Sequence, residues 1–410
     1  MAAFITQYFE SSKPAQFDWS LCFIPLILAS VGFIMVASAS IDLAAESYGD
    51  PWYFTKRHAV FLALAATTYV LILCLPSELW HRYGALLLIA GIVILGLVLM
   101  PGIGRRVNGA QRWISMGPFT LQASEVAKFC FVIFFASFLS RRTEEFQTSW
   151  KAFFNLLVIL GVFVSLLLAE PDFGNSVVLC ITAGAMMFIA GVPVIRFTLL
   201  VLVGVIGLLM LAVLSPYRWQ RLVSFWNPWE DPFHNGYQLT QSLIAFGRGE
   251  WAGLGLGNSL QKLFFLPEAH TDFIFAIVAE ELGFIGAALL VLIFFTLVWR
   301  IFYMAYQARA KNLFIAFTSI GVGVLLGAQA LINMSVACGL MPTKGITLPF
   351  VSSGGSSLII SFAFMALIFR MNMELAWERE REWAAGINYG GWNRRPRFSR
   401  SCISAGVAVT

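Results

Sequence analysis

The sequence has little charge. Only 12% of its 410 residues are Asp, Glu, Lys or Arg, while 59% are hydrophobic. A soluble domain is typically about 25% charged and 45–50% apolar, and this shortage of charge leaves too little polar surface to cover a water-soluble globule. We therefore expect that lipid, rather than water, surrounds most of the chain.

Several kinds of site are also missing from the sequence. The six cysteines are far apart, five in apolar runs and one in the polar tail, so no disulfide framework or Cys-x-x-Cys metal pair is predicted. The four histidines lack the spacing of metal ligands, and no basic run is dense enough for a nucleic-acid surface. The first 18 residues are polar and no cleavage site follows the first apolar run, which indicates a retained membrane anchor rather than a signal peptide.

Long apolar runs are what the sequence has in abundance. About 20 mostly apolar residues are needed to cross a hydrocarbon layer of roughly 30 Å. Ten runs meet or approach that length: Trp19–Ile41, His58–Leu75, Gly84–Met100, Leu121–Leu139, Ala152–Ala169, Asn175–Ala190, Phe197–Leu214, Asp272–Trp299, Leu313–Cys338 and Ser356–Phe369. We predict an all-α polytopic membrane protein with about ten transmembrane helices.

The membrane domain is expected over 19–371, between an N-terminal segment, 1–18, and a C-terminal tail, 372–410. Within the tail, the stretch Trp377–Trp383 alternates in charge and is typical of a solvated helix end. The residues from Ala384 onward are rich in Gly, Arg and Ser, so this end of the chain is expected to be disordered.

An even number of spans places both termini on one side of the membrane. If that side is the cytoplasm, sixteen Lys and Arg lie inside and ten outside, as the positive-inside rule expects. The outer face then carries one long loop, 215–271, and two shorter polar loops, Pro101–Thr120 and Gly339–Gly355. Because the inner loops are short and chemically plain, we expect any chemistry at the outer face.

Asp272 is the candidate catalytic residue. It stands at the end of the long outer loop, immediately before an apolar run, so its carboxylate would face the lipid headgroups as a base or as a metal ligand. The alternative is that Asp272 or Thr271 caps the next helix, since both residue types are preferred there. The two roles are compatible, because a carboxylate stays ionised at a helix N-terminus.

Basic residues gather in the outer loops, on the side that should be poor in positive charge. The candidates for substrate binding are Arg105, Arg112, Arg248 and Lys344. Such groups would hold a diphosphate, Arg through two parallel hydrogen bonds and Lys as a point charge. The alternative for each residue is general attraction to anionic lipid headgroups.

Two glycine-rich stretches also lie in the outer loops. The segment Val351–Ser357, which includes Ser353, could present backbone amides and a helix N-terminus to an anion, so Ser353 is a further substrate-binding candidate. Gly247–Gly257 superficially resembles a phosphate-binding loop but follows no predicted strand, so that interpretation fails. For either stretch, close helix packing is the simpler alternative.

Ionisable residues also lie within the apolar runs. Glu125 and Lys128 are three residues apart and so share a helical face. Because buried charges in membranes are costly and usually face a bundle interior or a water-filled cavity, the pair could line a cavity below the site or could simply neutralise itself. Glu280 and Glu281 lie about two turns after Asp272, and Glu281 is a further candidate for the cavity lining.

Several motifs resemble the SEDS family (shape, elongation, division and sporulation), and its cell-division branch most closely. The resemblance runs from Gly32-Phe-Ile-Met-Val-Ala-Ser-Ala-Ser to Pro342-Thr-Lys-Gly and Gly354-Gly-Ser-Ser. Its most specific blocks are Trp226-Asn-Pro-Trp-Glu-Asp-Pro, Gly236-Tyr-Gln-Leu-Thr-Gln-Ser, Phe246-Gly-Arg-Gly-Glu and Leu266-Pro-Glu-Ala-His-Thr-Asp-Phe-Ile-Phe-Ala. Two departures lie outside the block around Asp272: Gln122-Ala-Ser-Glu125, where the family has Gln-Pro-Ser/Ala-Glu, and Glu170-Pro-Asp-Phe-Gly174, where it has Gln-Pro-Asp-Leu-Gly.

The resemblance implies a ten-helix SEDS fold that polymerises lipid II into glycan strands at the division septum, in the bacterial inner membrane. It implies that the aspartate matching Asp272 is the residue most closely tied to activity. It implies a class B penicillin-binding protein, a transpeptidase, as partner, together with other division proteins. It is also compatible with a divalent cation, Mg or Mn, held at Asp272.

Two other classes of function compete with a polymerase. A flippase would carry lipid II across the bilayer and should place polar residues on both sides of a central pathway, whereas the motifs here lie on the outer side. A non-catalytic scaffold that recruits the transpeptidase would not need a carboxylate beside a basic cluster. The sequence therefore favours the polymerase.

Overall fold

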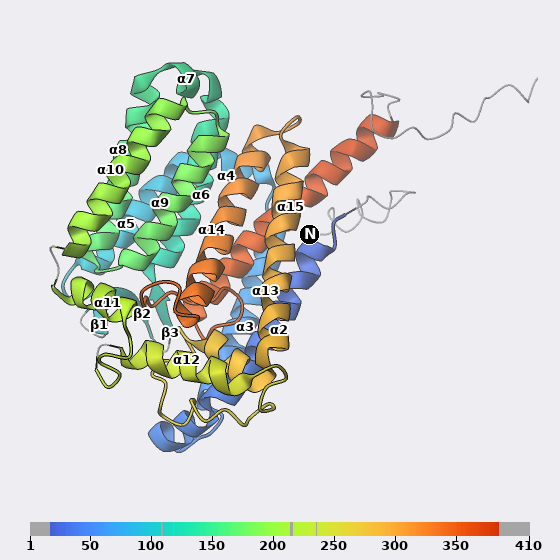
Figure 1. The fold of residues 1–410 in the computed structure, drawn as a ribbon. Helices are drawn as coiled ribbons and strands as arrows, with labels where there is room; N and C mark the ends of the chain where they lie inside the picture. The colour runs from blue at the N-terminus through green and yellow to red at the C-terminus, as the bar shows by residue number, and fades with distance from the viewer. Residues whose placement is uncertain (1–16, 108–109, 118, 214–215, 235, 385–410) are drawn as a thin grey trace, which may run out of the picture.

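The structure is a computed structural model that describes residues 17–107, 110–117, 119–213, 216–234 and 236–384. Helices dominate it, and a three-stranded sheet lies at one end (Figure 1). The helices are α2 (Ser20–Tyr48), α3 (Tyr53–Leu73), α4 (Ser77–Arg82), α5 (Gly84–Leu99), α6 (Ala123–Arg141), α7 (Thr143–Thr148), α8 (Trp150–Ala169), α9 (Phe173–Ile189), α10 (Val194–Val213), α11 (Pro216–Trp226), α12 (Tyr237–Gly249), α13 (Ile274–Ala308), α14 (Leu313–Ala337) and α15 (Gly355–Ala384). The strands are β1 (Gly104–Val107), β2 (Ala110–Met116) and β3 (Phe119–Gln122).

Each of the ten predicted apolar runs falls largely on a helix, although Leu121 belongs to β3 and Asp272 precedes α13. Seven of these helices are long and apolar enough to cross a membrane: α2, α3, α6, α8, α13, α14 and α15. The other three, α5, α9 and the apolar part of α10, are shorter apolar helices of 10–17 residues. The prediction of an all-α multi-pass membrane protein is therefore confirmed. The three shorter helices need flanking residues, or a locally thinner bilayer, to complete a crossing.

The interior of the bundle is built around α6, α14 and α15, which bury most of their surface inside the protein. Large aromatic side chains such as Phe131, Phe135 and Phe364 are fully enclosed there. By contrast, α2, α3, α8 and α13 bury only 22–39% of their most apolar stretch inside the protein. Exposure of this kind is the arrangement expected of helices whose outer surface faces lipid.

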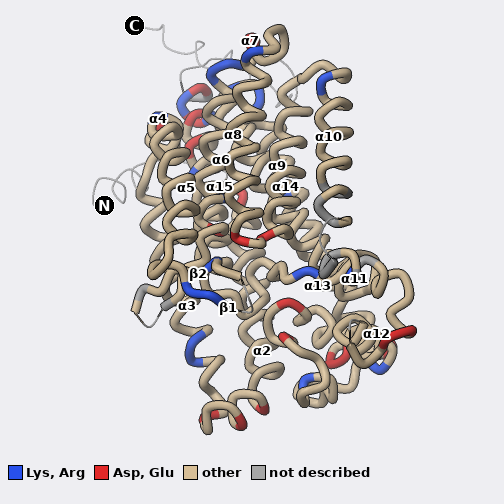
Figure 2. The backbone as a smooth tube through the Cα atoms, turned by 90° about the vertical axis from the view of Figure 1, so that its left-hand side faces the viewer, with Lys and Arg blue, Asp and Glu red and all other residues tan. Residues whose placement is uncertain are grey.

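The two described ends of the chain lie at the same end of the bundle. Asp18, just before α2, pairs with Arg300 near the end of α13 at 2.7 Å, and its backbone amide donates to Asn372 on α15 at 3.0 Å. The sheet, α11 and α12 lie at the opposite end (Figure 1). Most Lys, Arg, Asp and Glu positions lie toward these two ends (Figure 2), as expected of a protein whose middle is surrounded by hydrocarbon.

The antiparallel sheet was not predicted, because Pro101–Thr120 was identified only as a short polar loop. The sheet has the order β1-β2-β3, and Arg105 on β1 is opposite Trp113 on β2. One signal for it was present in the sequence: Asn108-Gly109, which lies outside the described residues, is a dipeptide typical of tight hairpins. The sheet matters for function because Arg112 lies on β2.

Two other segments have more helix than expected. α15 continues to Ala384, so the start of the tail expected at 372 falls inside a helix, and the predicted solvated helix end Trp377–Trp383 is helical. The predicted disorder from residue 385 onward falls outside the described residues. The long loop between α10 and α13 contains two helices, α11 and α12.

Candidate functional site

Asp272 lies two residues before the start of α13, at the end of the bundle that carries the sheet, α11 and α12. The residue at the N-cap position is Phe273 and no side chain makes a capping hydrogen bond there, so the interpretation of Asp272 or Thr271 as a helix cap is wrong. The carboxylate of Asp272 instead faces the loop between α14 and α15. A Cβ placed on Gly345 would lie 2.9 Å from Asp272 Oδ2, so the lack of a side chain at this glycine leaves space for the carboxylate.

The backbone around Asp272 is held in place from two sides. Asn333 on α14 donates through Nδ2 to the carbonyl oxygens of Asp272 at 2.8 Å and Ile346 at 2.7 Å. The amide of Ser353 donates to the carbonyl of His270 at 3.0 Å. The predicted anion-binding segment thus lies close to Asp272, but the amide of Ser353 is already bonded to His270, which leaves the half-buried Ser353 hydroxyl to contact a ligand.

Three cationic side chains from separate elements surround this region. Arg112 on β2 donates to the carbonyls of Glu170, at 3.1 Å, and Pro171. Arg221 on α11 donates to the carbonyl of Thr343 at 3.1 Å, beside the short loop that contacts Asp272. Lys344 places its ammonium 3.3 Å from the ring centroid of Phe173, at the start of α9. The positive charges of Arg112 and Arg221 both act on the Asp272 carboxylate.

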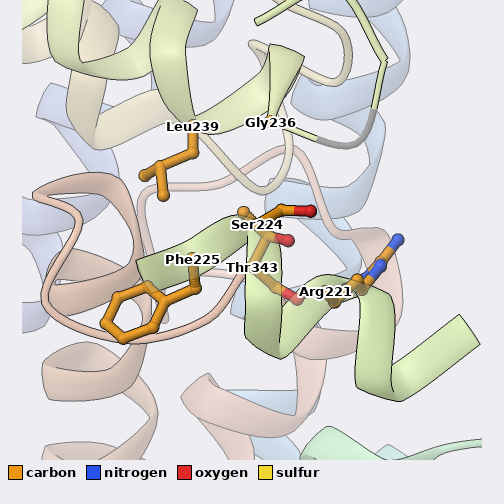
Figure 3. Close-up of a pocket in the computed structure, with 6 residues that line it drawn as sticks. All are labelled: Arg221, Ser224, Phe225, Gly236, Leu239 and Thr343. Carbon is orange, nitrogen blue, oxygen red and sulfur yellow. Dashed lines mark hydrogen bonds between the residues drawn. The ribbon is translucent and has the colours of Figure 1, made fainter. Parts of the chain in front are cut away.

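A small hollow lies beside Arg221, between α11, α12 and the loop after α14. It is lined by Arg221, Ser224, Phe225, Gly236, Leu239 and Thr343. Figure 3 shows the α11 side chains next to Thr343. Arg221 therefore reaches the site because the inner face of α11 packs against the loop that contains Lys344 and Gly345.

Burial raises the pKa of Asp272 from 3.8 to about 7, and the nearby Glu268 carboxylate adds to this rise, while Arg112 and Arg221 oppose it. At neutral pH the carboxylate is thus divided between its ionised and protonated forms. A carboxylate with a pKa near the working pH is a far better general base than an ordinary aspartate, whose pKa of about 3.9 makes it a weak base. The surroundings of Asp272 thus raise its pKa into the range that suits a general base.

Glu170 is a second unusual acid, and it shares Arg112 with Asp272, which the sequence did not predict. Its side chain is fully buried, and neither carboxylate oxygen has a hydrogen-bond partner among the described residues. Burial raises the pKa of Glu170 to about 8, with a further rise from Asp172 and an opposing effect of Arg112. A protonated Glu170 is neutral and close in shape to glutamine, the residue that the resemblance to the SEDS family implies at this position.

The raised pKa of Glu170 predicts a pH-dependent stability. Between about pH 4.5 and pH 8 the folded protein holds a proton on Glu170 that the unfolded chain has released, so the free energy of unfolding falls as pH rises through this range. We expect the thermal midpoint of the detergent-solubilised protein to fall more steeply from pH 5 to pH 8.5 than that of Glu170→Gln. Asp272 contributes a decline of the same sign to both proteins, and parallel curves would contradict the assignment to Glu170.

Glu125 and Lys128 form a buried ion pair at 2.8 Å. Lys128 also donates to Asn175 Oδ1 on α9 at 2.8 Å, and Asn175 donates in turn to Asp172 at 2.8 Å. The pair therefore belongs to a chain of buried polar contacts that joins α6 to α9 and ends in the loop held by Arg112. The pair thus links α6 to α9, and its role as a cavity lining stays a prediction.

Arg248, Glu280 and Glu281 form a separate cluster about two turns along α13 from Asp272. Glu280 is fully buried, pairs with Arg248 on α12 at 3.2 Å, and accepts hydrogen bonds from Ser259 and from the amides of Leu260 and Gln261. Glu281, also fully buried, pairs with Lys262 at 3.2 Å and accepts from Ser38 on α2 at 2.7 Å.

This cluster joins α12 and the loop that follows it to α13. Gly249 lies so close to α13 that a Cβ on it would be 1.9 Å from the carbonyl oxygen of Ala279, which supports close packing as the reason for the glycine-rich stretch. Just beyond the two glutamates, Gly283 has a φ of +68° and interrupts α13. Arg248 and Glu281 are thus occupied in positioning the loop, and the substrate-binding role of Arg248 stays a prediction.

Sequence reasoning missed three residues of this region. Arg221, Glu170 and Asp172 come together with Arg112 and Asp272 only through the fold, although Glu170 was visible as a departure from the family pattern. Arg105 is exposed on β1, on the strand next to that of Arg112, and its role in substrate binding remains untested.

Asp272 is also the residue predicted as a possible metal ligand. Among the described residues, no group of three or more His, Cys, Asp or Glu side chains could hold a metal ion. The donor set at Asp272 nonetheless fits a magnesium-type ion, which usually takes one or two carboxylates and completes its shell with water and substrate phosphate oxygens. A cation bound at Asp272 would therefore depend on water and on the phosphate oxygens of a bound molecule for its other ligands.

Comparison with known proteins identifies the family of this chain. The model of the FtsW/RodA/SpoVE cell cycle protein family matches residues 18–376. The probable peptidoglycan glycosyltransferase FtsW of Saccharophagus degradans is 54% identical over 366 residues, which cover 89% of this chain and 95% of that protein. A protein of the same name from Pseudomonas fluorescens is 47% identical over 350 residues, covering 85% of this chain and 86% of its own length.

Two solved structures share the fold. A chain from the work "Structural coordination of polymerization and crosslinking by a peptidoglycan synthase complex" has a TM-score of 0.71 and 28% identity, covering 88% of this chain and 98% of that one. The crystal structure of the rod shape determining protein RodA of Thermus thermophilus has a TM-score of 0.66 and 26% identity, covering 87% and 97%. The resemblance to the SEDS family is confirmed, and the chain belongs to the FtsW/RodA/SpoVE family of cell cycle proteins.

Proposed function

We propose that this chain is a peptidoglycan glycosyltransferase that polymerises lipid II into β-1,4-linked glycan strands. The observation that carries the proposal is the convergence of Asp272 with Arg112, Arg221 and Lys344 at one end of the membrane bundle. The names of the relatives, and the description of a structural neighbour as part of a peptidoglycan synthase complex, support the same activity.

The reaction requires one inversion, because lipid II carries its sugar α-linked to pyrophosphate and the product is β-linked. A single displacement needs a base that takes the proton from the acceptor 4-hydroxyl. With its pKa near 7, Asp272 can accept that proton at neutral pH. The bond to the acceptor oxygen forms as the bond to the pyrophosphate oxygen breaks, so no covalent enzyme intermediate is needed.

The leaving pyrophosphate develops negative charge as it departs. The positive charges of Arg112 and Arg221 act on Asp272, and Lys344 is the neighbour of Gly345, which borders the carboxylate. A guanidinium binds phosphate oxygens through paired hydrogen bonds. A divalent cation bound by Asp272 and the diphosphate would supply further charge stabilisation to the leaving group. Whether Asp272 serves as base or as metal ligand, the same residues bind and orient the substrate.

The family and its structural neighbour support a membrane setting and a protein partner. We propose that the chain works with a class B transpeptidase and other division proteins at the septum, with both termini in the cytoplasm. Asp272 then faces the periplasmic side, where the sugar of lipid II is used. The flippase and scaffold alternatives are less well supported, because the candidate site lies at one end of the bundle and contains Asp272, whose pKa is raised to about 7.

The proposal is tested by glycan synthesis in vitro. Purified protein in proteoliposomes would be given lipid II, with and without the cognate transpeptidase and with and without Mg²⁺ or Mn²⁺, and polymer length would be read by gel electrophoresis. We expect polymer in at least one of these conditions. Transfer of lipid II between leaflets without any polymer would support the flippase instead, and the absence of both activities would support the scaffold.

Arg221 provides a test of diphosphate binding. Loss of one charge-assisted hydrogen bond costs about 1.5–3 kcal/mol, so we expect Arg221→Ala to raise the lipid II concentration for half-maximal rate by roughly tenfold or more. Arg142→Ala, at an exposed position between α6 and α7, is the control for loss of a positive charge. An unchanged dependence on lipid II in Arg221→Ala would remove Arg221 from the binding site.

A further inference from the structure

Helix α11 has an exposed apolar face. Trp219, Val223 and Trp226 are 51%, 54% and 88% exposed, and their spacing of four and three residues places them on one stripe of the helix. The opposite stripe contains Arg221, Ser224 and Phe225, which are partly buried and border the hollow beside Thr343 (Figure 3). α11 therefore covers the protein with one face and presents aromatic and aliphatic side chains on the other.

The exposed face of α11 continues the lipid-facing surface of α10. α10 begins as one of the shorter apolar helices of the membrane bundle, and it exposes Val203, Ile206, Met210 and Val213 along its length, up to 62% in the case of Met210. α11 follows at the outer end of α10, contacts it, and is turned across its axis (Figure 1). The apolar surface therefore passes from a helix that runs through the bilayer to a helix that lies across its edge.

We propose that α11 lies at the membrane–water interface on the outer side of the same bilayer, with Trp219, Val223 and Trp226 inserted among lipids, and that this position of α11 holds Arg221 beside Asp272. Amphipathic helices that lie in the interface insert an apolar face and keep a polar face outside, and Trp is the residue most typical of this depth. Lipid is the expected occupant because the patch is continuous with α10 rather than isolated on a water-exposed loop.

The inner face of α11 connects the position of this helix to the charge around Asp272. Arg221 is fixed by its bond to the carbonyl of Thr343, 3.1 Å away, and its charge acts on Asp272. Thr343 precedes Lys344 and Gly345, the residues that border Asp272 and the start of α9. A shift of α11 away from the bilayer would therefore draw Arg221 away from the carboxylate. This second part of the inference rests on the proposed function.

The depth of α11 can be measured without any enzymatic assay. A nitroxide attached at Val223→Cys, in full-length protein whose native cysteines are replaced, would be placed in phosphatidylglycerol–phosphatidylethanolamine vesicles. We expect the label to collide several-fold more often with oxygen than with a water-soluble nickel chelate. The matched control is a label at Glu46→Cys, an exposed charged position at the outer end of α2, which should favour the chelate.

Two outcomes of this measurement would overturn the inference. One is a Val223 label as accessible to the nickel chelate as the Glu46 label. The other is protection that appears only after the transpeptidase is added, which would make the face a protein-docking surface instead.

The link to Arg221 is tested by activity in the same vesicles. Val223→Asp places a charge on the lipid-facing stripe and is expected to raise the half-saturating lipid II concentration about tenfold, whereas Val223→Leu keeps the apolar face and should behave as the parent. Equal activity of the two variants, with the label in the bilayer, would overturn the link to Arg221. If the parent protein makes no glycan, the proposed function fails while the depth measurement still decides the position of α11.

Discussion

Asp272→Ala and Asp272→Asn are expected to abolish glycan synthesis from lipid II while the protein remains folded and inserted in the membrane. General-base catalysis typically contributes about 10²–10⁴-fold, and a metal-binding role for the same carboxylate would cost at least as much. The fold should survive, because Asn333 binds the backbone carbonyl of Asp272 rather than its side chain. The measurement is polymer formed per unit time in the presence of the transpeptidase, with size-exclusion chromatography as the test of folding.

The control for this prediction is Asp50→Asn. Asp50 precedes α3 and forms an exposed ion pair with Lys56 at 2.8 Å, a type of contact that contributes about 0–1 kcal/mol. Its loss should leave the rate nearly unchanged. If Asp272→Asn, folded and correctly inserted, made polymer at the rate of the Asp50→Asn control, Asp272 would have no part in the reaction.

The pH profile of the parent protein adds a second readout for Asp272. Because the pKa of Asp272 is about 7, the ionised fraction, and with it the rate, should rise as pH increases from about 6 to 8 if Asp272 is the base. Substitution of Glu268 by Gln removes a charge that raises this pKa, so the rising limb should move to lower pH.

Lys128→Met is expected to give the largest loss of stability. Lys128 and its partner Glu125 are almost completely buried, and removal of one member leaves the other charge unpaired in a medium of low dielectric constant. Such a change typically costs about 3–5 kcal/mol. Asn175 also loses a donor, and its link to Asp172 lies next to the loop bound by Arg112, so weaker glycan synthesis should accompany the lower thermal midpoint.

The matched control is the double variant Glu125→Gln, Lys128→Met. It removes both charges at once, so most of the stability lost in Lys128→Met should return. Thermal unfolding of the two variants and the parent in the same detergent gives the comparison. If the single and double variants had the same midpoint, the stability of this region would not depend on the buried pair.

Several features of the site could be predicted from the sequence because they depend on local pattern. Asp272 stands between a polar loop and an apolar run, so its position at the membrane boundary follows from hydrophobicity alone. Lys344 and Ser353 lie in a polar segment between two apolar runs, and the structure places both close to Asp272. Glu125 and Lys128 are partners because a spacing of three residues joins side chains on one helical face.

Other features could not be predicted, because they depend on contacts between distant segments. Arg112, Arg221 and Arg248 are all outer-loop arginines, and nothing in their neighbouring residues distinguishes them as ligands of a substrate. The fold places Arg112 and Arg221 where their charges act on Asp272, whereas Arg248 forms an ion pair with Glu280. The small sheet and α11, which carry the first two, were not expected within the loops.

The sequence by itself determined the multi-pass membrane character and the presence of an acid at one boundary of the membrane, since the apolar runs must be buried in lipid wherever the rest of the chain lies. Tertiary structure alone decided the electrostatics of that acid. The pKa of Asp272 depends on burial, on Glu268 and on two arginines that are more than 50 residues away in the sequence, and only the packing of β2, α11 and the loop after α14 brings these charges within range of one another.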